Sequence, residues 1–261
     1  MSFITTKLYG RMGNQMFQIA ATMGAAWKHG AEFLIPRYTG TKPGHGGDPL
    51  YFNHFPEYQG QHIKFNFHEN GHGYKEIKYS PDMCIDGYFQ SEKYFSHIRE
   101  EVLMWFEKAF DLTRPQRPDT VALHVRRGDY VGNKNFPLVP MTFFDQAIAH
   151  FVKQGFTKFF VSSDDIEWCK ENLHQPVEFE FTEDRTPQQN LWEMSRCAHQ
   201  IISNSTFSWW SGWLNRNPDK QVIAPAANRW FAEQVAMDMR DVIPESWIQI
   251  PYEWEAVKEM A

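Results

Sequence analysis

The chain of 261 residues is predicted to adopt an α/β fold in two halves. A strand-loop-helix pattern opens the chain, short strands alternate with helices across residues 121–225, and the segment "DLTRPQRPDT" (111–120) separates the two regions. Strands that alternate with helices of this length are typical of parallel βαβ units. We therefore expect an N-terminal domain over 1–110, a linker over 111–120 and a C-terminal domain over 121–261.

The N-terminal half is expected to begin with a strand over 3–9 and a polar loop over 10–15. A helix over 16–30 follows, because Gly30 is a usual residue at the C-terminal end of a helix. Further along, we expect strands at 32–37 and 83–90 and a helix over 91–110. From about Tyr38 to Tyr79 the periodicity is lost, and a loop this long is usually functional or mobile.

In the C-terminal half, runs of β-branched and aromatic residues predict five strands, and apolar periodicity between them predicts four helices. The strands are expected at 121–127, 158–163, 177–181, 199–205 and 220–225. The helices are expected at 141–154, 165–173, 187–198 and 206–217.

Composition excludes several classes of protein. The net charge of −6 argues against bulk binding of nucleic acid, which needs a basic face. No apolar run approaches the ~20 residues that a membrane span needs, and the N-terminus lacks the pattern of a secretory signal. The three cysteines are odd in number, which favours reduced thiols in a cytoplasm over a disulfide framework. We expect a cytoplasmic protein without a membrane span.

Polar residues follow three of the predicted C-terminal strands, in "HVRRGDY" (124–130), "FVSSDD" (160–165) and "IISNSTF" (201–207). In open parallel sheets, ligands bind just beyond the carboxyl ends of the strands. The three polar segments are therefore predicted to share one edge of the sheet and to form a ligand site.

Arg126 and Arg127 reach the end of their strand together, with Gly128 allowing a close turn. Guanidinium groups match phosphate oxygens bidentately and stay charged at cellular pH, so the pair indicates a phosphate site. The alternative is a surface Arg-Asp pair with an ordinary turn. An adhesion signal in Arg127-Gly128-Asp129 is not favoured, since that needs an exposed, flexible loop on a secreted protein.

Ser205 and Thr206 lie where a helix is predicted to begin, and the unpaired N–H groups of a helix start bind anions. Alternatively, Ser203, Asn204 or Ser205 caps this helix. The tryptophans of the helix favour core packing over ligand stacking, with Trp209 over Trp213 on one face.

Asp164 and Asp165 have two open interpretations: they cap the following helix, or they accept hydrogen bonds from ribose hydroxyls or a purine. The "GRMGNQ" loop (10–15) has no third glycine placed for a dinucleotide fingerprint, so its polar residues favour local turn chemistry. The middle loop carries five histidines (His45, His54, His62, His68 and His72), but their spacing does not favour a zinc site.

Together, five segments resemble the successive signatures of the α-1,2-fucosyltransferases, which are inverting enzymes that use GDP-fucose. These are "GRMGNQMFQIA" (10–20), "IDGYFQSEKYF" (85–95), "LHVRRGDYV" (123–131), "FFVSSDDIEWCKENL" (159–173) and "IISNSTFSWWSGWLN" (201–215). The resemblance implies a GT-B-like fold of two facing Rossmann-like domains, with the nucleotide bound mainly by the C-terminal one and the acceptor by the N-terminal one.

The resemblance also implies residue roles. Arg126 would bind the β-phosphate, His124 would lie by the guanine, and Ser205, Thr206 and Phe207 would bind the pyrophosphate. Gly13 and Asn14 would face the donor across the cleft. Further donor-binding candidates are Arg127, Asp164, Asp165, Asn190 and Asn204.

Asn190 departs from the family, in which an acidic residue usually stands at that position. A carboxylate there would accept two guanine N–H bonds with more charge assistance than an amide oxygen. Either guanine selectivity is weaker here, or Glu183 or Asp184 substitutes.

The expected reaction transfers L-fucose from GDP-β-L-fucose to the 2-hydroxyl of a terminal galactoside, with inversion. Arg126, Asp129 and His124 are the catalytic candidates, with Arg126 stabilising the leaving phosphate and Asp129 as the general base. GDP-fucose is a co-substrate and no metal is expected, because arginine supplies the positive charge and no D-x-D motif is present. The alternatives are another linkage or acceptor, or an inactive sugar-nucleotide-binding module.

Overall fold

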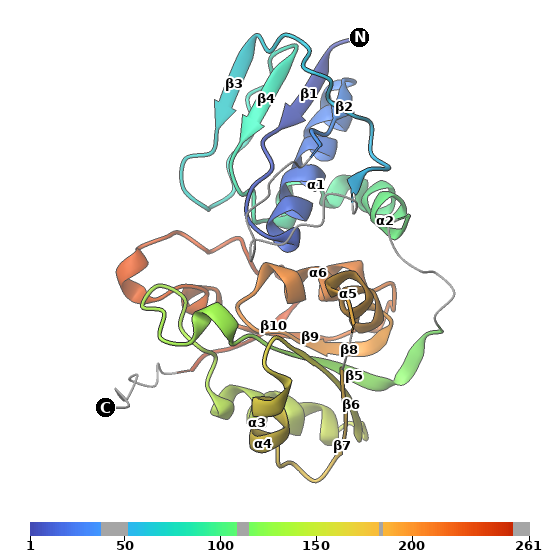
Figure 1. Cartoon of the computed structure of the whole chain (residues 1–261), viewed down its shortest axis with the longest axis vertical. Coiled ribbons are helices and arrows are strands. Elements are labelled where there is room, and N and C mark those ends of the chain that lie inside the picture. Colours follow the sequence, from blue (N-terminus) through green and yellow to red (C-terminus); the bar gives the residue numbers. More distant parts are fainter. Residues whose placement is uncertain (38–51, 109–114, 183–184, 253–261) are drawn as a thin grey trace. The chain divides into compact units, whose positions relative to one another are not determined.

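The computed structural model describes residues 1–37, 52–108, 115–182 and 185–252. The chain forms two compact units (Figure 1). The first contains Met1–Asp111 and Asp238–Pro244, and the second contains Leu112–Met237 and Glu245–Ala261.

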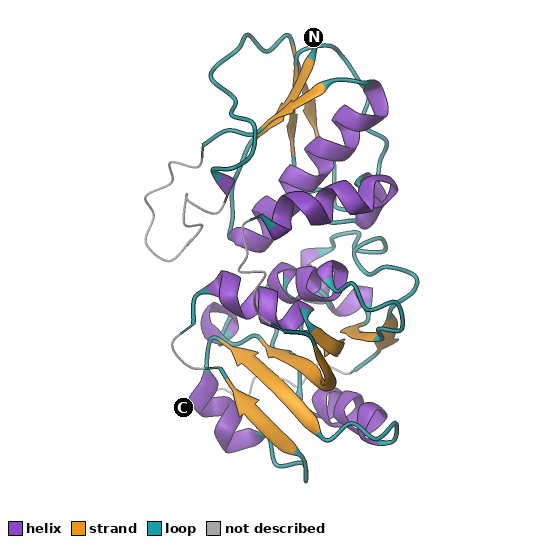
Figure 2. Ribbon diagram, turned by 90° about the vertical axis from the view of Figure 1, so that its right-hand side faces the viewer, coloured by secondary structure: helices purple, strands orange, loops and turns teal. Residues whose placement is uncertain are grey.

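The first unit holds a parallel four-stranded sheet in the order β2-β1-β4-β3. Its strands are β1 (Phe3–Thr6), β2 (Glu32–Leu34), β3 (Phe65–His68) and β4 (Met83–Asp86). Its helices are α1 (Met12–His29) and α2 (Arg99–Glu107), preceded by the 3-10 turns η2 (Glu92–Tyr94) and η3 (Ser96–Ile98). Figure 2 shows how the helices pack against the strands of this unit.

Helix α1 ends at Gly30, as predicted, and that residue adopts a left-handed conformation with φ 61°. The helix starts at Met12 instead of Met16, because the Arg11 carbonyl accepts from the N–H groups of Asn14 and Gln15. Residues 12–15, expected as loop, therefore form the first turn of the helix. Gly24 allows close packing: a Cβ there would lie 2.1 Å from the Tyr94 carbonyl oxygen.

The second unit holds a parallel six-stranded sheet in the order β10-β9-β8-β5-β6-β7. Its strands are β5 (Arg117–Val125), β6 (Lys158–Ser163), β7 (Glu178–Phe181), β8 (Cys197–Ile201), β9 (Val222–Pro225) and β10 (Ile248–Ile250). Its helices are α3 (Met141–Val152), α4 (Ile166–Asn172), α5 (Pro187–Ser195) and α6 (Thr206–Leu214). The 3-10 turns are η4 (Gly128–Tyr130), η5 (Ala227–Arg229) and η6 (Glu233–Val235).

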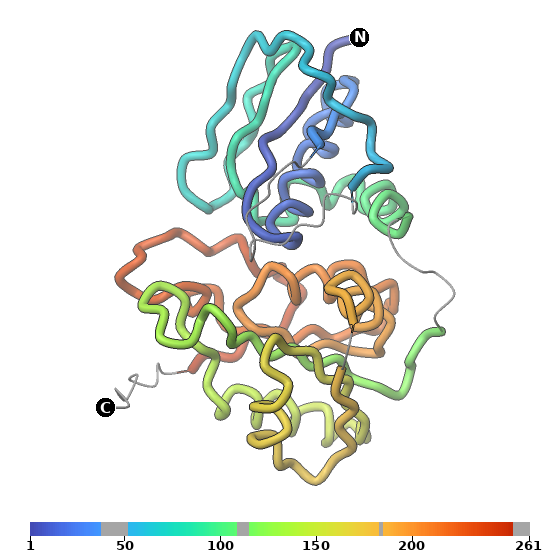
Figure 3. The backbone as a smooth tube through the Cα atoms, in the orientation of Figure 1, coloured from blue at the N-terminus to red at the C-terminus, as the bar shows by residue number. Residues whose placement is uncertain are grey.

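The second sheet is covered on both faces, with α3 and α4 on one side and α5 and α6 on the other (Figure 1). Along β5, Val121, Leu123 and Val125 join a core cluster with the apolar residues of α3. This agrees with the predicted alternation, which sends His124 to the other face. The loops after β5 and β9 lie side by side (Figure 3), and Ala232 N–H donates to the Asn135 carbonyl at 3.1 Å.

The topology of the second sheet places a switch point between β5 and β8. From β5 the chain adds β6 and β7 on one side, then returns to the other side of β5 for β8, β9 and β10. Ligands of open α/β sheets bind at such points, beyond the carboxyl ends of the strands.

The α/β class is confirmed, as are the five strands and four helices expected in the second half, within a few residues at their ends. Two strands were not predicted, β3 and β10. Strand β5 begins at Arg117, inside the segment expected to be a linker. Residues 238–244, expected in the C-terminal domain, belong to the first unit.

Cys84, Cys169 and Cys197 are buried free thiols. Burial raises the pKa of Cys84 and of Cys169 to about 11, which keeps both in the thiol form at neutral pH. Among the described helices, none is long and apolar enough to cross a membrane.

Candidate active site

The ends of three neighbouring strands form the candidate site, as the sequence predicted. Arg126 follows β5, and its Nη1 lies 2.7 Å from Oδ2 of Asp164, which follows β6. His124 near the end of β5 lies 2.8 Å, Nδ1 to Oγ, from Ser203 after β8. The polar segments therefore meet at the switch point of the sheet.

Arg126 is held between two carboxylates. Asp164 binds one terminal nitrogen, Asp129 binds the other, and the guanidinium lies over the Tyr130 ring at 5.0 Å. The two carboxylates thus accept from the same N–H groups of the Arg126 guanidinium that could bind phosphate oxygens. Asp129 is 53% exposed against 29% for Asp164, so Asp129 is the carboxylate with room to move away.

Gly128 is required where these groups meet. Its φ is +26°, and a Cβ at this position would lie 2.2 Å from Oδ2 of Asp164. The same carboxylate accepts the Arg127 N–H at 2.8 Å. A side chain at residue 128 would therefore push Asp164 away from both arginines.

Arg127 points to a different partner from Arg126. Its Nε lies 2.9 Å from Oδ2 of Asp165, and its guanidinium lies 3.9 Å from the centre of the Trp168 ring. Asp165 is the N-cap of α4, with Oδ1 accepting from Trp168 N–H at 3.3 Å. The capping interpretation of Asp165 is thus confirmed, and the Arg127 side chain fastens β5 to α4.

The Arg127-Gly128-Asp129 tripeptide is part of a folded turn, η4. The Arg127 side chain is only 16% exposed, and both charged side chains are ion-paired within the chain. This differs from the flexible, exposed loop that an adhesion signal requires.

His124 is buried, and its ring lies 5.3 Å from that of Phe207. Burial, with a smaller contribution from the nearby Arg126 charge, lowers the pKa of His124 to about 3. The imidazole is therefore neutral at physiological pH and a weak base. Its contact with Ser203 suits it to positioning the start of α6.

Helix α6 begins without a side-chain cap at Ser205 and has no acidic residue in its first turn. Ser203 contacts His124, while Asn204 is buried and its Nδ2 donates to the carbonyls of Pro137 and Trp230 at 3.0 and 3.2 Å. The capping alternative is therefore not realised at Ser205. The helix start, with Thr206 as its first residue, has the electrostatic character of an anion site.

The tryptophans of α6 belong to the core, as predicted. Trp209, Trp210 and Trp213 are buried. The rings of Trp209 and Trp213 stack at 6.3 Å with an interplanar angle of 12°.

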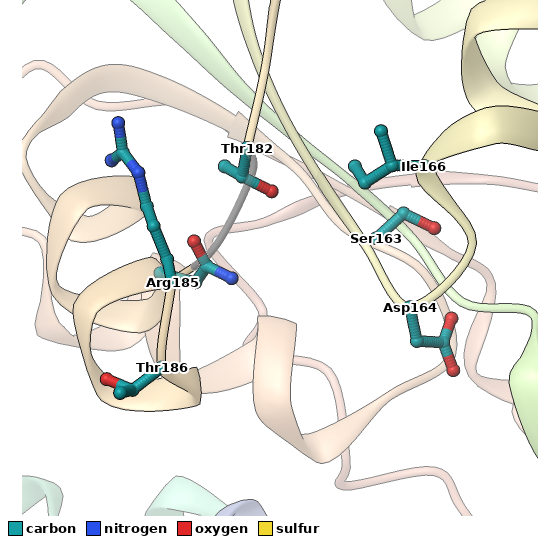
Figure 4. A pocket seen from close by; sticks show the side chains of 7 residues that line it. Ser163, Asp164, Ile166, Thr182, Arg185 and Thr186 are labelled. Atoms are coloured by element: carbon teal, nitrogen blue, oxygen red, sulfur yellow. The ribbon is translucent and has the colours of Figure 1, made fainter.

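A pocket of about 510 Å³ opens beside Asp164 (Figure 4). It lies at the ends of β6 and β7 and the start of α5, and is lined by Ser163, Asp164, Ile166, Thr182, Arg185, Thr186 and Asn190. Oδ1 of Asn190 is buried and has no hydrogen-bond partner among the described residues. Glu183 and Asp184, the suggested substitutes for an acidic residue at 190, lie outside those residues.

Comparison with known proteins identifies the family. The model of "Glycosyl transferase family 11" matches residues 51–251. The chain belongs to glycosyl transferase family 11.

Two relatives illustrate the range of this family. The glycosyltransferase is 30% identical over 295 aligned positions to the alpha-1,2-colitosyltransferase of Escherichia coli, covering 96% of this chain and 99% of that one. It is 28% identical to the galactoside 2-alpha-L-fucosyltransferase SEC1 of Bos taurus, covering 80% and 64%. Among solved structures, POFUT1 in complex with GDP has a TM-score of 0.49 at 15% identity, covering 85% of this chain and 98% of that one.

In the first unit of the glycosyltransferase, Gly13 and Asn14 lie in the first turn of α1. Oδ1 of Asn14 accepts from Nε2 of Gln90 at 3.1 Å, which joins two of the signature segments. Gly10 is favoured in this turn because its φ is +76°, and a Cβ there would also lie 2.5 Å from Nδ2 of Asn14.

Glu69 is a buried carboxylate that sequence reasoning missed. It accepts from the N–H groups of Tyr88 and Phe89 at 2.7 and 3.0 Å, and Phe89 has a φ of +51°. Burial raises the pKa of Glu69 above its ordinary range. Glu69 thus holds the "IDGYFQ" turn, and no periodic signal around it marks this role.

Three histidines of the middle segment have separate contacts. His68 lies 3.3 Å from Asp86, His72 stacks on Tyr88, and His54 bonds to the Trp105 carbonyl. His45 lies outside the described residues. Within the described ranges, no three metal-ligating side chains gather.

Proposed function

We propose that this glycosyltransferase moves L-fucose from GDP-β-L-fucose to the 2-hydroxyl of a terminal galactoside, with inversion at the anomeric carbon. One observation carries the proposal: Arg126 lies at the switch point of the sheet, and Asp164 joins it to the neighbouring pocket. The galactoside fucosyltransferase among the relatives supports the fucosyl group and the linkage.

The nucleotide is proposed to lie along this edge of the sheet. Arg126 and the N–H groups at the start of α6 bind the diphosphate, since both favour anions. The guanine occupies the pocket, where the buried Oδ1 of Asn190 accepts a guanine N–H. Gly13 and Asn14 stay predicted donor-binding residues, as the family resemblance implies.

The reaction forms a bond from the acceptor 2-oxygen to the anomeric carbon and breaks the bond from that carbon to the β-phosphate oxygen. Negative charge grows on the phosphate while the sugar becomes oxocarbenium-like. Arg126 meets the charge where it develops, which stabilises the transition state more than the ground state. Because Arg126 supplies this charge, the proposed mechanism uses no divalent metal.

Asp129 is the proposed general base. When phosphate oxygens take its place on Arg126, its exposed carboxylate becomes available to accept the proton of the acceptor hydroxyl. His124 is proposed to position the site through Ser203, because its neutral, buried imidazole is too weak a base for this step.

Colitosyl transfer is a second candidate, favoured by the match to the Escherichia coli colitosyltransferase along nearly the whole of both chains. Colitose is L-fucose without its 3-hydroxyl, so both donors present the same phosphate and C6 methyl. An assay of GDP-fucose and GDP-colitose against a panel of galactosides, with linkage analysis of the product, separates the two. Absence of product with either donor would favour an inactive sugar-nucleotide-binding module, and another linkage in the product would favour the remaining alternative.

Replacing Arg126 tests the central role. Arg126→Ala is expected to lower turnover on the order of 10²–10³-fold, as loss of one oxyanion-stabilising donor does. Arg126→Lys should restore little, because the fork geometry is lost. Arg240→Ala removes a 76% exposed arginine and is the control. Near-normal turnover in Arg126→Ala would contradict the proposal.

A further inference from the structure

Three aromatic rings extend the candidate site away from the pocket. Tyr130, Phe136 and Phe231 form a continuous row, with ring centres 5.1 Å apart from Tyr130 to Phe136 and 5.1 Å apart from Phe136 to Phe231. Arg126 lies over the Tyr130 ring, so the row begins at the proposed phosphate site. All three rings are partly exposed. We call these residues the three-ring wall.

The wall is held by contacts between loops. Asn204 donates to the carbonyls of Pro137 and Trp230, and its own carbonyl accepts from the Tyr130 hydroxyl at 3.3 Å. These bonds join the loops that follow β5, β8 and β9. The rings are therefore in place before a ligand arrives, which reduces the ordering cost of binding.

The order of the strands indicates which part of the donor would contact the three-ring wall. The pocket lies at the ends of β6 and β7, Arg126 lies at the switch between β5 and β8, and Phe231 follows β9. A nucleoside diphosphate sugar is linear, with the base at one end, the diphosphate in the middle and the sugar at the other end. With the base in the pocket and the diphosphate at Arg126, the sugar reaches the wall.

We infer that the three-ring wall binds the C6 methyl group of the donor sugar and selects a 6-deoxyhexose. This inference rests on the proposed function, and it explains how the chain distinguishes fucose or colitose from a hexose with a C6 hydroxyl. A methyl group gains from contact with aromatic rings. A hydroxyl in the same place loses its water and finds no hydrogen-bond partner on a ring face.

Donor binding tests the inference without knowledge of the acceptor. We would measure the dissociation constants of GDP, GDP-L-fucose and GDP-L-galactose by calorimetry, because the two sugars differ only by the C6 hydroxyl. Wild type should prefer GDP-L-fucose by roughly tenfold to a hundredfold, as apolar pockets do for such a change. Phe231→Ala should reduce this preference to about threefold or less while leaving the affinity for GDP within about twofold.

Two controls keep the result specific. Phe231→Leu retains an apolar side chain and should keep most of the preference for GDP-L-fucose. This variant also tests the three-ring wall if Phe231→Ala does not fold. Phe156→Ala removes a partly buried ring that contacts His199 and precedes the amino end of β6, away from the strand ends that form the site. It should leave the preference for GDP-L-fucose unchanged.

The outcomes separate the two proposals. If wild type binds neither GDP-sugar, the proposed function fails. If wild type prefers GDP-L-fucose and Phe231→Ala keeps that preference in full, the three-ring wall is not the sugar site and the proposed function stands. A large loss of preference in Phe231→Leu would also overturn the inference, because apolar contact would then not be the cause.

Discussion

Gly128 permits the contact on which the arginine pair depends, since its missing side chain leaves room for the Asp164 carboxylate. We expect Gly128→Ala to destabilise the second unit by about 2 kcal/mol or more and to lower turnover, because backbone strain and a steric clash add together. Urea denaturation and a transfer assay measure the two effects.

Gly132→Ala is the matched control for this change. Gly132 lies in the same loop with a φ of +72°, and nothing lies within 4 Å of its would-be Cβ. The free energy of unfolding of Gly132→Ala should fall by only about 1 kcal/mol, which is the cost of placing alanine in a left-handed conformation. Equal effects in the two variants would show that Asp164 moves aside without cost.

Asp129 is proposed to compete with phosphate for Arg126 and also to act as the base. Its replacement should therefore change turnover and GDP affinity in opposite directions. Asp129→Asn is expected to lower turnover by about 10²-fold while GDP binds severalfold more tightly. Kinetics and calorimetry on one preparation check this. Glu167→Gln, at an exposed carboxylate paired with Lys170, should leave both unchanged. Unchanged turnover in Asp129→Asn would show that Asp129 is not the base.

His124 should make the protein less stable in acid. Its folded pKa of about 3 lies below the unfolded value near 6.5, so between these pH values the unfolded chain binds a proton that the folded chain does not. Stability is therefore lost as pH falls through this range, by roughly 1 kcal/mol per pH unit. Urea denaturation at pH 6.5, 5.5 and 4.5 should give a flatter dependence for His124→Gln.

Exposed His174 provides the comparison, and His174→Gln should keep the wild-type slope. If His124→Gln also keeps that slope, the folded protein carries a charged imidazole at position 124. A positioning role through Ser203 would then need to be reconsidered.

Single residues were predictable where a strand end marked them. Arg126, Asp164 and Ser203 follow three apolar runs, and the parallel arrangement alone brings them together. Their pairing was not predictable, because it depends on side-chain geometry that spacing does not carry. Phe231 gave no signal at all, since it follows β9 in a segment without periodicity.

At the level of elements, prediction succeeded where burial produced a pattern. Strands β5 and β6 are buried along most of their length and appear in the sequence as apolar runs. Strand β3 is at the edge of its sheet and mostly exposed, so Phe65–His68 lacks that contrast. The start of α1 was missed because Gly13, Asn14 and Gln15 make its first turn look like a polar loop, although Met12 in that turn is buried.

The whole molecule has a connection that local patterns do not reveal. After β9 the chain passes through the second unit to Met237, contributes Asp238–Pro244 to the first unit, and returns for β10. Oδ2 of Asp241 accepts the Tyr74 N–H at 2.9 Å, and Oδ1 lies 2.5 Å from Nζ of Lys93. This carboxylate fastens the returning segment to the first unit.

Replacing Asp241 should therefore loosen the first unit selectively. In Asp241→Ala, the Tyr74 N–H loses its bond to the carboxylate and the ion pair between Lys93 and Asp241 is lost, at a cost of about 1.5–3 kcal/mol for a bond to a charged group. Hydrogen exchange followed by mass spectrometry should show exchange at residues 70–77 and 92–95 faster by about tenfold or more, while residues 197–201 of β8 exchange as in wild type. Asp238→Ala, at a more exposed carboxylate that binds Arg240 two residues away, should change little. Equally faster hydrogen exchange in both units would contradict a selective effect of Asp241 on the first unit. Unchanged exchange at Tyr74 would mean that Asp241 does not hold residues 238–244 in place.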